Sequence, residues 1–183
     1  MAVRDPRDVA AFTDFADAHA ANLFRTAYLV VGEHQLAEDL VQEALVKTYV
    51  AWPRIRDHDK ATSYARRVVV TTAISWRRRR SFHERPQQAL PETSAADPVD
   101  GVGLRDGLWH ELASLPPRQR AAIVLRYYED LSESRTAEVM GCSVGTVKSQ
   151  VSAGPHAATQ PGRWAHVRIR GGRQDGDEPQ HRA

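Results

Sequence analysis

Apolar residues recur at three- and four-residue steps through the first fifty positions of the chain. Over residues 12–31 this spacing predicts an amphipathic helix that ends at Gly32. From Leu36 the pattern continues to Trp52, where Pro53 ends it, because proline lacks the amide N–H and clashes with the preceding turn. The pattern therefore predicts two neighbouring helices that pack against each other.

Residues 63–80 give a mixed signal. The run Val68-Val69-Val70-Thr71-Thr72 is β-branched and suits a buried strand on propensity alone. The segment is nevertheless longer than an ordinary strand, contains neither glycine nor proline, and has apolar positions at helical steps from Ala65 to Trp76. We therefore expect a third helix.

Residues 81–107 change in character, with prolines, glycines and acids in place of large apolar side chains. This composition is typical of a flexible linker between two domains. Beyond it, Leu108, Trp109, Leu112 and Leu115 begin a second helical cluster, and the Pro116-Pro117 pair opens the next helix.

A helix-turn-helix is predicted over residues 131–152. Ser132 and Ser143 are placed to cap two short helices, and Gly141 supplies the left-handed turn between them. In the second helix, the valines at 144, 147 and 151 are expected to face inward. Small and polar side chains then remain for a partner such as the major groove of DNA: Ser143, Thr146, Lys148, Ser149 and Ser152.

Charge and composition narrow the class of protein. The net charge is only +2, but residues 62–80 hold six arginines and no acid, which favours contact with a phosphate backbone. No apolar run approaches the roughly 20 residues of a membrane helix, so we expect a cytoplasmic protein. The single cysteine, Cys142, and the scattered histidines predict no metal site. The sequence shows no pair of a nucleophile and a base, so we expect neither an enzyme nor a bound cofactor.

Taken together, the two helical clusters resemble the extracytoplasmic function (ECF) sigma factors of bacterial RNA polymerase, within them the actinobacterial SigE type. The resemblance covers roughly residues 9 to 152. It rests on the order of several motifs: Arg25-Thr26-Ala27-Tyr28-Leu29, Ala37-Glu38-Asp39-Leu40-Val41-Gln42-Glu43-Ala44, Ser75-Trp76-Arg77-Arg78-Arg79-Arg80, Leu115-Pro116-Pro117-Arg118-Gln119-Arg120, Leu125-Arg126-Tyr127-Tyr128 and Gly141-Cys142-Ser143-Val144-Gly145-Thr146-Val147-Lys148-Ser149.

The resemblance implies an all-α fold of two small domains joined by a flexible linker. Sigma region 2 would occupy residues 9–80 and would bind core RNA polymerase and the minus-ten promoter element. Sigma region 4, at residues 108–152, would read the minus-thirty-five element with its helix-turn-helix. Core polymerase and promoter DNA are the implied partners, and an anti-sigma factor is a further partner that the resemblance allows.

Within the first domain, the resemblance assigns Asp39, Gln42 and Glu43 to the polymerase-facing surface. Their spacing places all three on one helix face, opposite the apolar stripe. The alternative interpretation is a solvated face on which Glu43 pairs with Lys47.

The basic helix of the first domain would approach DNA near the minus-ten element. Its arginines would contact phosphate, whereas Trp76 fits the apolar stripe and is expected in the core. The arginines assigned to DNA are Arg66, Arg67, Arg77, Arg78, Arg79 and Arg80.

The chain departs from the family pattern at Ala153-Gly154-Pro155, where relatives continue the recognition helix. Residues 153–183 contain no leucine and no sustained periodicity, so a largely disordered tail is expected. The resulting short recognition helix predicts weakened minus-thirty-five binding with an intact polymerase surface. Two other functions remain open: a helix-turn-helix regulator that never joins polymerase, and a degenerate sigma factor that binds polymerase or an anti-sigma factor without full initiation activity.

Overall fold

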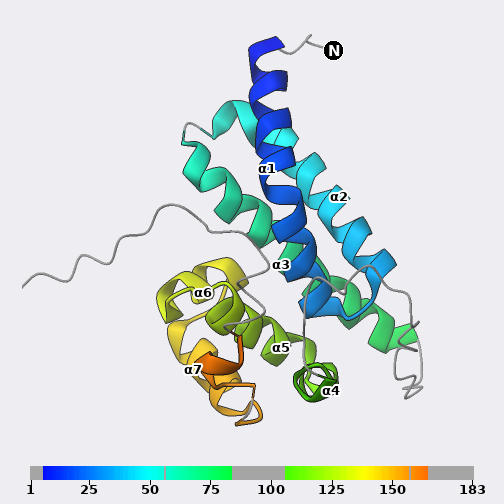
Figure 1. Ribbon diagram of the computed structural model, residues 1–183, viewed down its shortest axis with the longest axis vertical. Coiled ribbons are helices and arrows are strands. Elements are labelled where there is room, and N and C mark those ends of the chain that lie inside the picture. The colour runs from blue at the N-terminus through cyan, green and yellow to red at the C-terminus, as the bar shows by residue number, and fades with distance from the viewer. Residues whose placement is uncertain (1–5, 56, 84–105, 157, 165–183) are drawn as a thin grey trace, which may run out of the picture.

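The computed structural model describes residues 6–55, 57–83, 106–156 and 158–164. Three long helices form the first cluster, and each of them packs against the other two (Figure 1). They are α1 (Pro6–Val31), α2 (His34–Ala51) and α3 (His58–His83), with the 3-10 turn η1 (Trp52–Arg54) after α2. The three helices expected in this part of the chain are confirmed.

The boundaries of α1 and α2 follow from glycine and proline. Gly32 ends α1 with a φ of 83°, a left-handed conformation that costs other residues free energy, and its N–H donates to the carbonyl of Tyr28 at 2.7 Å. Pro53 lies inside η1, where its missing N–H leaves no helical hydrogen bond unmade. The indole of Trp52 is buried there, with ring centroids 5.3 Å from Phe12 and 5.2 Å from Phe15.

The β-branched segment forms the middle of α3 rather than a strand. Val69 and Val70 are fully buried, as are Ala65 and Ala61, one and two turns before Val69. Trp76 is partly buried against the same core, as expected. Burial on a helical face therefore outweighs the modest intrinsic preference of β-branched residues for strands.

In the described residues, the second cluster begins with five helical elements. They are α4 (Asp106–Ser114), α5 (Pro117–Ile123), the π-helical turn η3 (Val124–Tyr128), α6 (Glu133–Met140) and α7 (Val144–Ser152). Residues 84–105, which include most of the expected linker 81–107, lie outside the described residues, and α3 continues to His83 before this gap.

The helix-turn-helix forms as expected from its capping residues. The side chain of Ser132 accepts a hydrogen bond from the N–H of Arg135 at 3.2 Å, and Ser143 accepts one from Thr146 at 3.1 Å. Gly141 lies between the helices with a φ of 63°. One detail of the prediction is wrong: Val147 is fully buried, but Val144 is 38% exposed, because it is the first residue of α7 and precedes the buried turn.

Part of the tail that was expected to lack structure from Ala153 onward is folded, namely residues 153–156 and 158–164. A Cβ at Gly154 would lie 2.5 Å from Cδ1 of Ile123, so glycine allows the chain to pass directly over α5. The indole of Trp164, in the 3-10 turn η4 (Pro161–Trp164), is fully buried and donates to the carbonyl of Ala158 at 3.0 Å. The prediction missed this segment because one large aromatic residue can anchor a chain that has no helical periodicity. Residues 165–183 lie outside the described residues.

The two clusters share one continuous hydrophobic core. Helix α1 packs against α5 and η3, and α3 packs against α5 and α6 (Figure 1). The rings of Tyr28 and Trp109 stack across this boundary with centroids 5.2 Å apart. The sequence predicted two domains on a linker, and the structure adds that they are held together in a closed arrangement.

Candidate functional site

The outer face of α2 carries the three residues assigned to polymerase binding. Asp39 and Gln42 are exposed, and Glu43 is partly exposed. Leu40 and Ala44 on the opposite side of the helix are fully buried, so the expected division of the helix into two faces is confirmed. Figure 1 shows α2 on the side of the molecule away from α6 and α7.

Two valines extend this α2 face, and the sequence prediction did not include them. Val46 is 63% exposed and Val50 is 61% exposed, and both follow Asp39, Gln42 and Glu43 at helical steps of three and four. Their position on the polar side of the apolar stripe was the available signal. Lys47 lies beside this face and pairs with Glu43 at 2.5 Å, so the alternative ion pair also forms.

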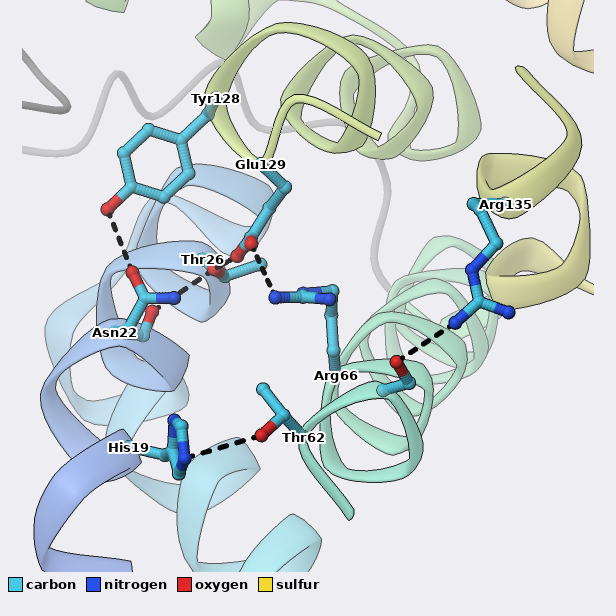
Figure 2. Close-up of polar contacts among 9 residues, drawn as sticks. His19, Asn22, Thr26, Thr62, Arg66, Tyr128, Glu129 and Arg135 are labelled. Carbon is cyan, nitrogen blue, oxygen red and sulfur yellow. Dashed lines mark hydrogen bonds and ion pairs between the residues drawn. The ribbon is translucent and has the colours of Figure 1, made fainter. Parts of the chain in front are cut away.

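The DNA-assigned face of α3 is partly covered by the second cluster. The guanidinium of Arg66 is buried, and its Nη2 lies 2.8 Å from Oε2 of Glu129, whose side chain is only 3% exposed. The hydroxyl of Thr26 donates to the other carboxylate oxygen of Glu129 (Figure 2). Arg66, expected to meet phosphate, therefore faces protein in this structure.

The other arginines of α3 have different surroundings. Arg67 is exposed, and its guanidinium lies close to the Gly141 turn, 3.9 Å from where a Cβ would stand. The hydroxyl of Ser63 accepts a hydrogen bond from Arg135 of α6 at 3.2 Å (Figure 2). The helical backbone of α3 continues through residues 77–80, but the side chains of Arg77, Arg78, Arg79 and Arg80 lie outside what the structure describes.

Two titratable side chains near Arg66 and Glu129 have shifted pKa values. Burial, followed by the nearby carboxylate of Glu129, raises the pKa of Tyr128 to about 12, and its hydroxyl donates to the side-chain carbonyl of Asn22 at 3.4 Å. Burial, followed by the positive charge of Arg66, lowers the pKa of His19. Both groups are therefore uncharged at neutral pH, which suits their partly or fully buried positions.

Arg120 of α5 makes a further hydrogen bond across the boundary between the two clusters. Its guanidinium is almost fully buried and donates to the carbonyl of Val30 at the end of α1, at 3.4 Å, and to the carbonyl of Ala113 in α4. Carbonyls in the last turn of a helix lack helical donors, so this arginine satisfies groups that burial would otherwise leave unpaired.

The exposed side of α7 carries the residues assigned to DNA in the helix-turn-helix. Lys148, Ser149 and Ser152 are exposed, while Thr146 is partly buried with its hydroxyl 2.9 Å from that of Ser143. Lys148 also lies 3.6 Å from Glu133, a contact between exposed groups that a phosphate can displace. The structure thus brings all five residues to one end of the second cluster.

Within the described ranges, no helix has the length and apolar character needed to cross a membrane. The same ranges hold no cluster of three or more histidine, cysteine, aspartate or glutamate side chains arranged for a metal ion.

Both halves of this chain are similar in sequence to known protein families. Residues 15–83 match the Sigma-70 region 2 family, and residues 105–154 match the family Sigma-70, region 4. The RNA polymerase sigma-E factor of Streptomyces avermitilis is 38% identical over 142 residues, which are 78% of this chain and 79% of that protein. Its counterpart from Streptomyces coelicolor is 37% identical over 78% of this chain and 80% of its own length.

More distant proteins are also similar to this chain. The ECF RNA polymerase sigma factor SigW of Bacillus subtilis is 25% identical over 168 residues, covering 82% of this chain and 88% of that protein. A solved structure of the sigma factor RpoE from Bartonella quintana, in complex with the anti-sigma factor NepR, superposes with a TM-score of 0.58. That match has 22% identity and covers 86% of this chain and 96% of the Bartonella chain.

Proposed function

This chain belongs to the extracytoplasmic function sigma factors of bacterial RNA polymerase, and we propose that it binds core polymerase through the outer face of α2. The observation that carries the proposal is the exposure of Val46 and Val50 beside Asp39, Gln42 and Glu43. Apolar side chains surrounded by polar ones are typical of a protein interface, since the apolar centre gains from burial and the polar rim sets orientation.

Promoter recognition is divided between the two clusters. Residues 9–80 form region 2, whose α3 arginines meet the DNA backbone near the minus-ten element, and residues 108–152 form region 4, which reads the minus-thirty-five element through α7. Arginine is suited to the first role because its planar guanidinium binds phosphate with two hydrogen bonds. Residues 81–107 connect the two regions.

Recognition by α7 is expected to be weak. The helix spans nine residues, about 14 Å at the rise of an α-helix, and ends at Ser152. A short helix offers few positions for phosphate contact on either side of the bases that it reads. The polymerase-binding face of α2 lies far from this end and does not depend on it.

The chain acts by binding and has no catalytic activity of its own. Its place of action is the cytoplasm, together with its polymerase and promoter DNA. An anti-sigma factor is a further partner, which the complex of the Bartonella relative with NepR supports.

The test is a pull-down of purified core polymerase with three matched variants. Val46→Glu and Val50→Glu each place a charge in the centre of the α2 face, and we expect a loss of at least about tenfold in retained polymerase because a desolvated charge is costly. Val9→Glu makes the same change at a 40%-exposed valine of α1 and serves as the control.

Full retention by both α2 variants would contradict the proposal, provided that circular dichroism shows all three variants to be folded. The same assay separates a sigma factor from a helix-turn-helix regulator that binds DNA alone, because such a regulator would not retain polymerase. Transcription in vitro from a cognate promoter then distinguishes an active sigma factor from a degenerate one.

A further inference from the structure

The helix-turn-helix carries no net positive charge. Residues 131–162 contain two basic residues, Arg135 and Lys148, and two acids, Glu133 and Glu138. Each basic residue is paired with an acid, because Nη1 of Arg135 lies 2.6 Å from Oε2 of Glu138 and Nζ of Lys148 lies 3.6 Å from Oε2 of Glu133. Contacts with phosphate supply much of the affinity of a protein for DNA, so this motif alone provides little of it.

Positive charge returns directly after the motif, in a segment that we call the basic run, residues 163–173. This segment contains four arginines and no acid, so its charge is +4. The arginines are Arg163, Arg168, Arg170 and Arg173. The next acid, Asp175, follows only after the run has ended. The positive charge that the helix-turn-helix lacks is therefore concentrated in the segment that follows it.

Trp164, the second residue of the basic run, fixes the start of the run to the second cluster. Its indole is fully buried, donates to the carbonyl of Ala158 at 3.0 Å, and lies with its ring centroid 6.4 Å from that of Tyr128. Its element, η4, packs against η3, and α5 packs against both η3 and α7. The basic run therefore begins on the same small cluster as the recognition helix.

The distance that the basic run can span suits a contact with DNA beside α7. The nine residues after Trp164, which end at Arg173, reach at most about 30 Å when extended, about twice the length of α7. Duplex DNA carries one negative charge for about each 1.7 Å along its axis, so many phosphates lie within this reach. A second contact tethered to the same cluster is made at high effective concentration and adds to the affinity of the first.

We propose that the basic run is a second DNA-binding segment of this chain, tethered to the second cluster by Trp164 and directed at the phosphate backbone. It raises the affinity for all duplexes alike and leaves the choice of base sequence to α7, because phosphate contacts carry no direct sequence information. This inference rests on the proposed function, since it takes the second cluster to bind DNA.

The first test changes three arginines of the basic run together in the full chain. One variant combines Arg168→Gln, Arg170→Gln and Arg173→Gln, and its matched control replaces the same three residues by lysine, which keeps the charge. Arg163 is left unchanged because it adjoins Trp164. Binding to a duplex of mixed sequence is followed by fluorescence anisotropy over a range of salt concentrations.

We expect the glutamine variant to lose at least about tenfold in DNA affinity at low salt. Each lost phosphate contact lowers the slope of log affinity against log salt by about 0.9, so the slope should become shallower by about 2.7 when all three contacts are lost. The lysine variant should keep the wild-type slope. Equal slopes in the glutamine variant and the wild type would overturn the proposal.

A second control separates a local contact from a general effect of net charge. Arg7→Gln removes an exposed charge at the start of α1, which lies at the end of the molecule away from α7 (Figure 1). We expect this variant to change the salt slope by less than about a third of the 0.9 expected for each arginine of the basic run. An equal change for each charge removed would show that position is irrelevant and would overturn the proposal.

The tether is tested by insertion of a flexible glycine and serine linker between Trp164 and Ala165. About 20 added residues lengthen the connection from Trp164 to Arg170 more than fourfold, and effective concentration falls as about the −3/2 power of linker length. The affinity for DNA should fall by up to about ninefold although no charge has changed. Wild-type affinity in the insertion variant would overturn the role of Trp164 as a tether.

Lipid headgroups also present phosphate and negative charge, so a membrane surface is the competing target of the basic run. Co-sedimentation with vesicles of phosphatidylcholine and phosphatidylserine measures this binding in the wild type and the glutamine variant. We expect little binding in either. Vesicle binding that depends on the three arginines, together with an unchanged salt slope on DNA, would overturn the proposal in favour of a membrane contact.

These outcomes are separate from those of the proposed function. The glutamine variant should retain core polymerase like the wild type, because the α2 face is unchanged. Lys148→Gln tests DNA binding by α7 itself and should lower the salt slope by about 0.9. A shallower slope in Lys148→Gln but not in the glutamine variant of the basic run would overturn this inference and leave the proposed function intact.

Discussion

Individual residues decide where the helices of this protein begin and end. Ser132, Ser143 and Gly141 act within three or four positions of themselves, through hydrogen bonds to nearby N–H groups or through a left-handed φ. Such interactions can be predicted from sequence because both partners lie in the same short segment. Glu129 is the opposite case, since its partners, Thr26 and Arg66, lie far away in the chain.

Gly141 and Gly145 lie four residues apart in the helix-turn-helix and should respond oppositely to alanine, because Gly141 is left-handed and Gly145 is helical. Gly141→Ala forces a Cβ into a φ of 63° and should lower the free energy of unfolding by about 1 kcal/mol. Gly145→Ala lies inside α7, where the new Cβ meets nothing closer than 3.8 Å, and should raise it by about 0.5 kcal/mol. Urea unfolding followed by circular dichroism measures both; a shift of the same sign in the two variants would contradict this account.

At the scale of elements, length and periodicity predict α3 better than residue propensity does. The β-branched run from Val68 to Thr72 lies within a 26-residue helix, because the helical spacing of its apolar residues allows them to reach one core. The segment from Ala153 to Trp164 shows the limit of this reasoning. It has no periodicity, and its fold depends on the burial of Trp164 against the second cluster.

Trp164 should therefore stabilise the helix-turn-helix. Trp164→Ala removes a fully buried indole whose ring centroid lies 6.4 Å from that of Tyr128, and we expect a loss of about 3 kcal/mol in the free energy of unfolding. Trp164→Phe keeps most of the apolar contact and loses the hydrogen bond to Ala158, so it should cost less than the alanine variant. Denaturant unfolding tests this, and wild-type stability in Trp164→Ala would show that the extension does not buttress the cluster.

At the scale of the whole molecule, polar side chains connect the two clusters. Arg120 and the pair formed by Arg66 and Glu129 cross the boundary, and Tyr28 stacks on Trp109 beside them. None of these contacts follows from local pattern, because each one joins residues on opposite sides of the linker 81–107. No local pattern indicates that Arg66 pairs with Glu129, and the sequence alone therefore favours a DNA contact for Arg66.

A double-mutant cycle measures the coupling across this boundary. Arg66→Met or Glu129→Met alone leaves one buried charge without its partner, and each should cost about 3 kcal/mol in the free energy of unfolding. The double variant should cost less than the sum, because no buried charge remains unpaired. The exposed pair of Arg135 and Glu138, treated in the same way, should show a coupling below about 1 kcal/mol. Additive losses at Arg66 and Glu129 would rule out a coupled pair.

The sequence by itself determined the helices, their caps, the helix-turn-helix, the two faces of α2 and the family. Each of these depends on residues within a few turns of one another, or on motifs whose order can be recognised without coordinates. The tertiary structure decided three further points: the burial of Arg66, the anchoring of the extension by Trp164 and the exposure of Val46 and Val50. These depend on which surfaces meet in space, and that is set by the packing of the whole chain rather than by any local pattern.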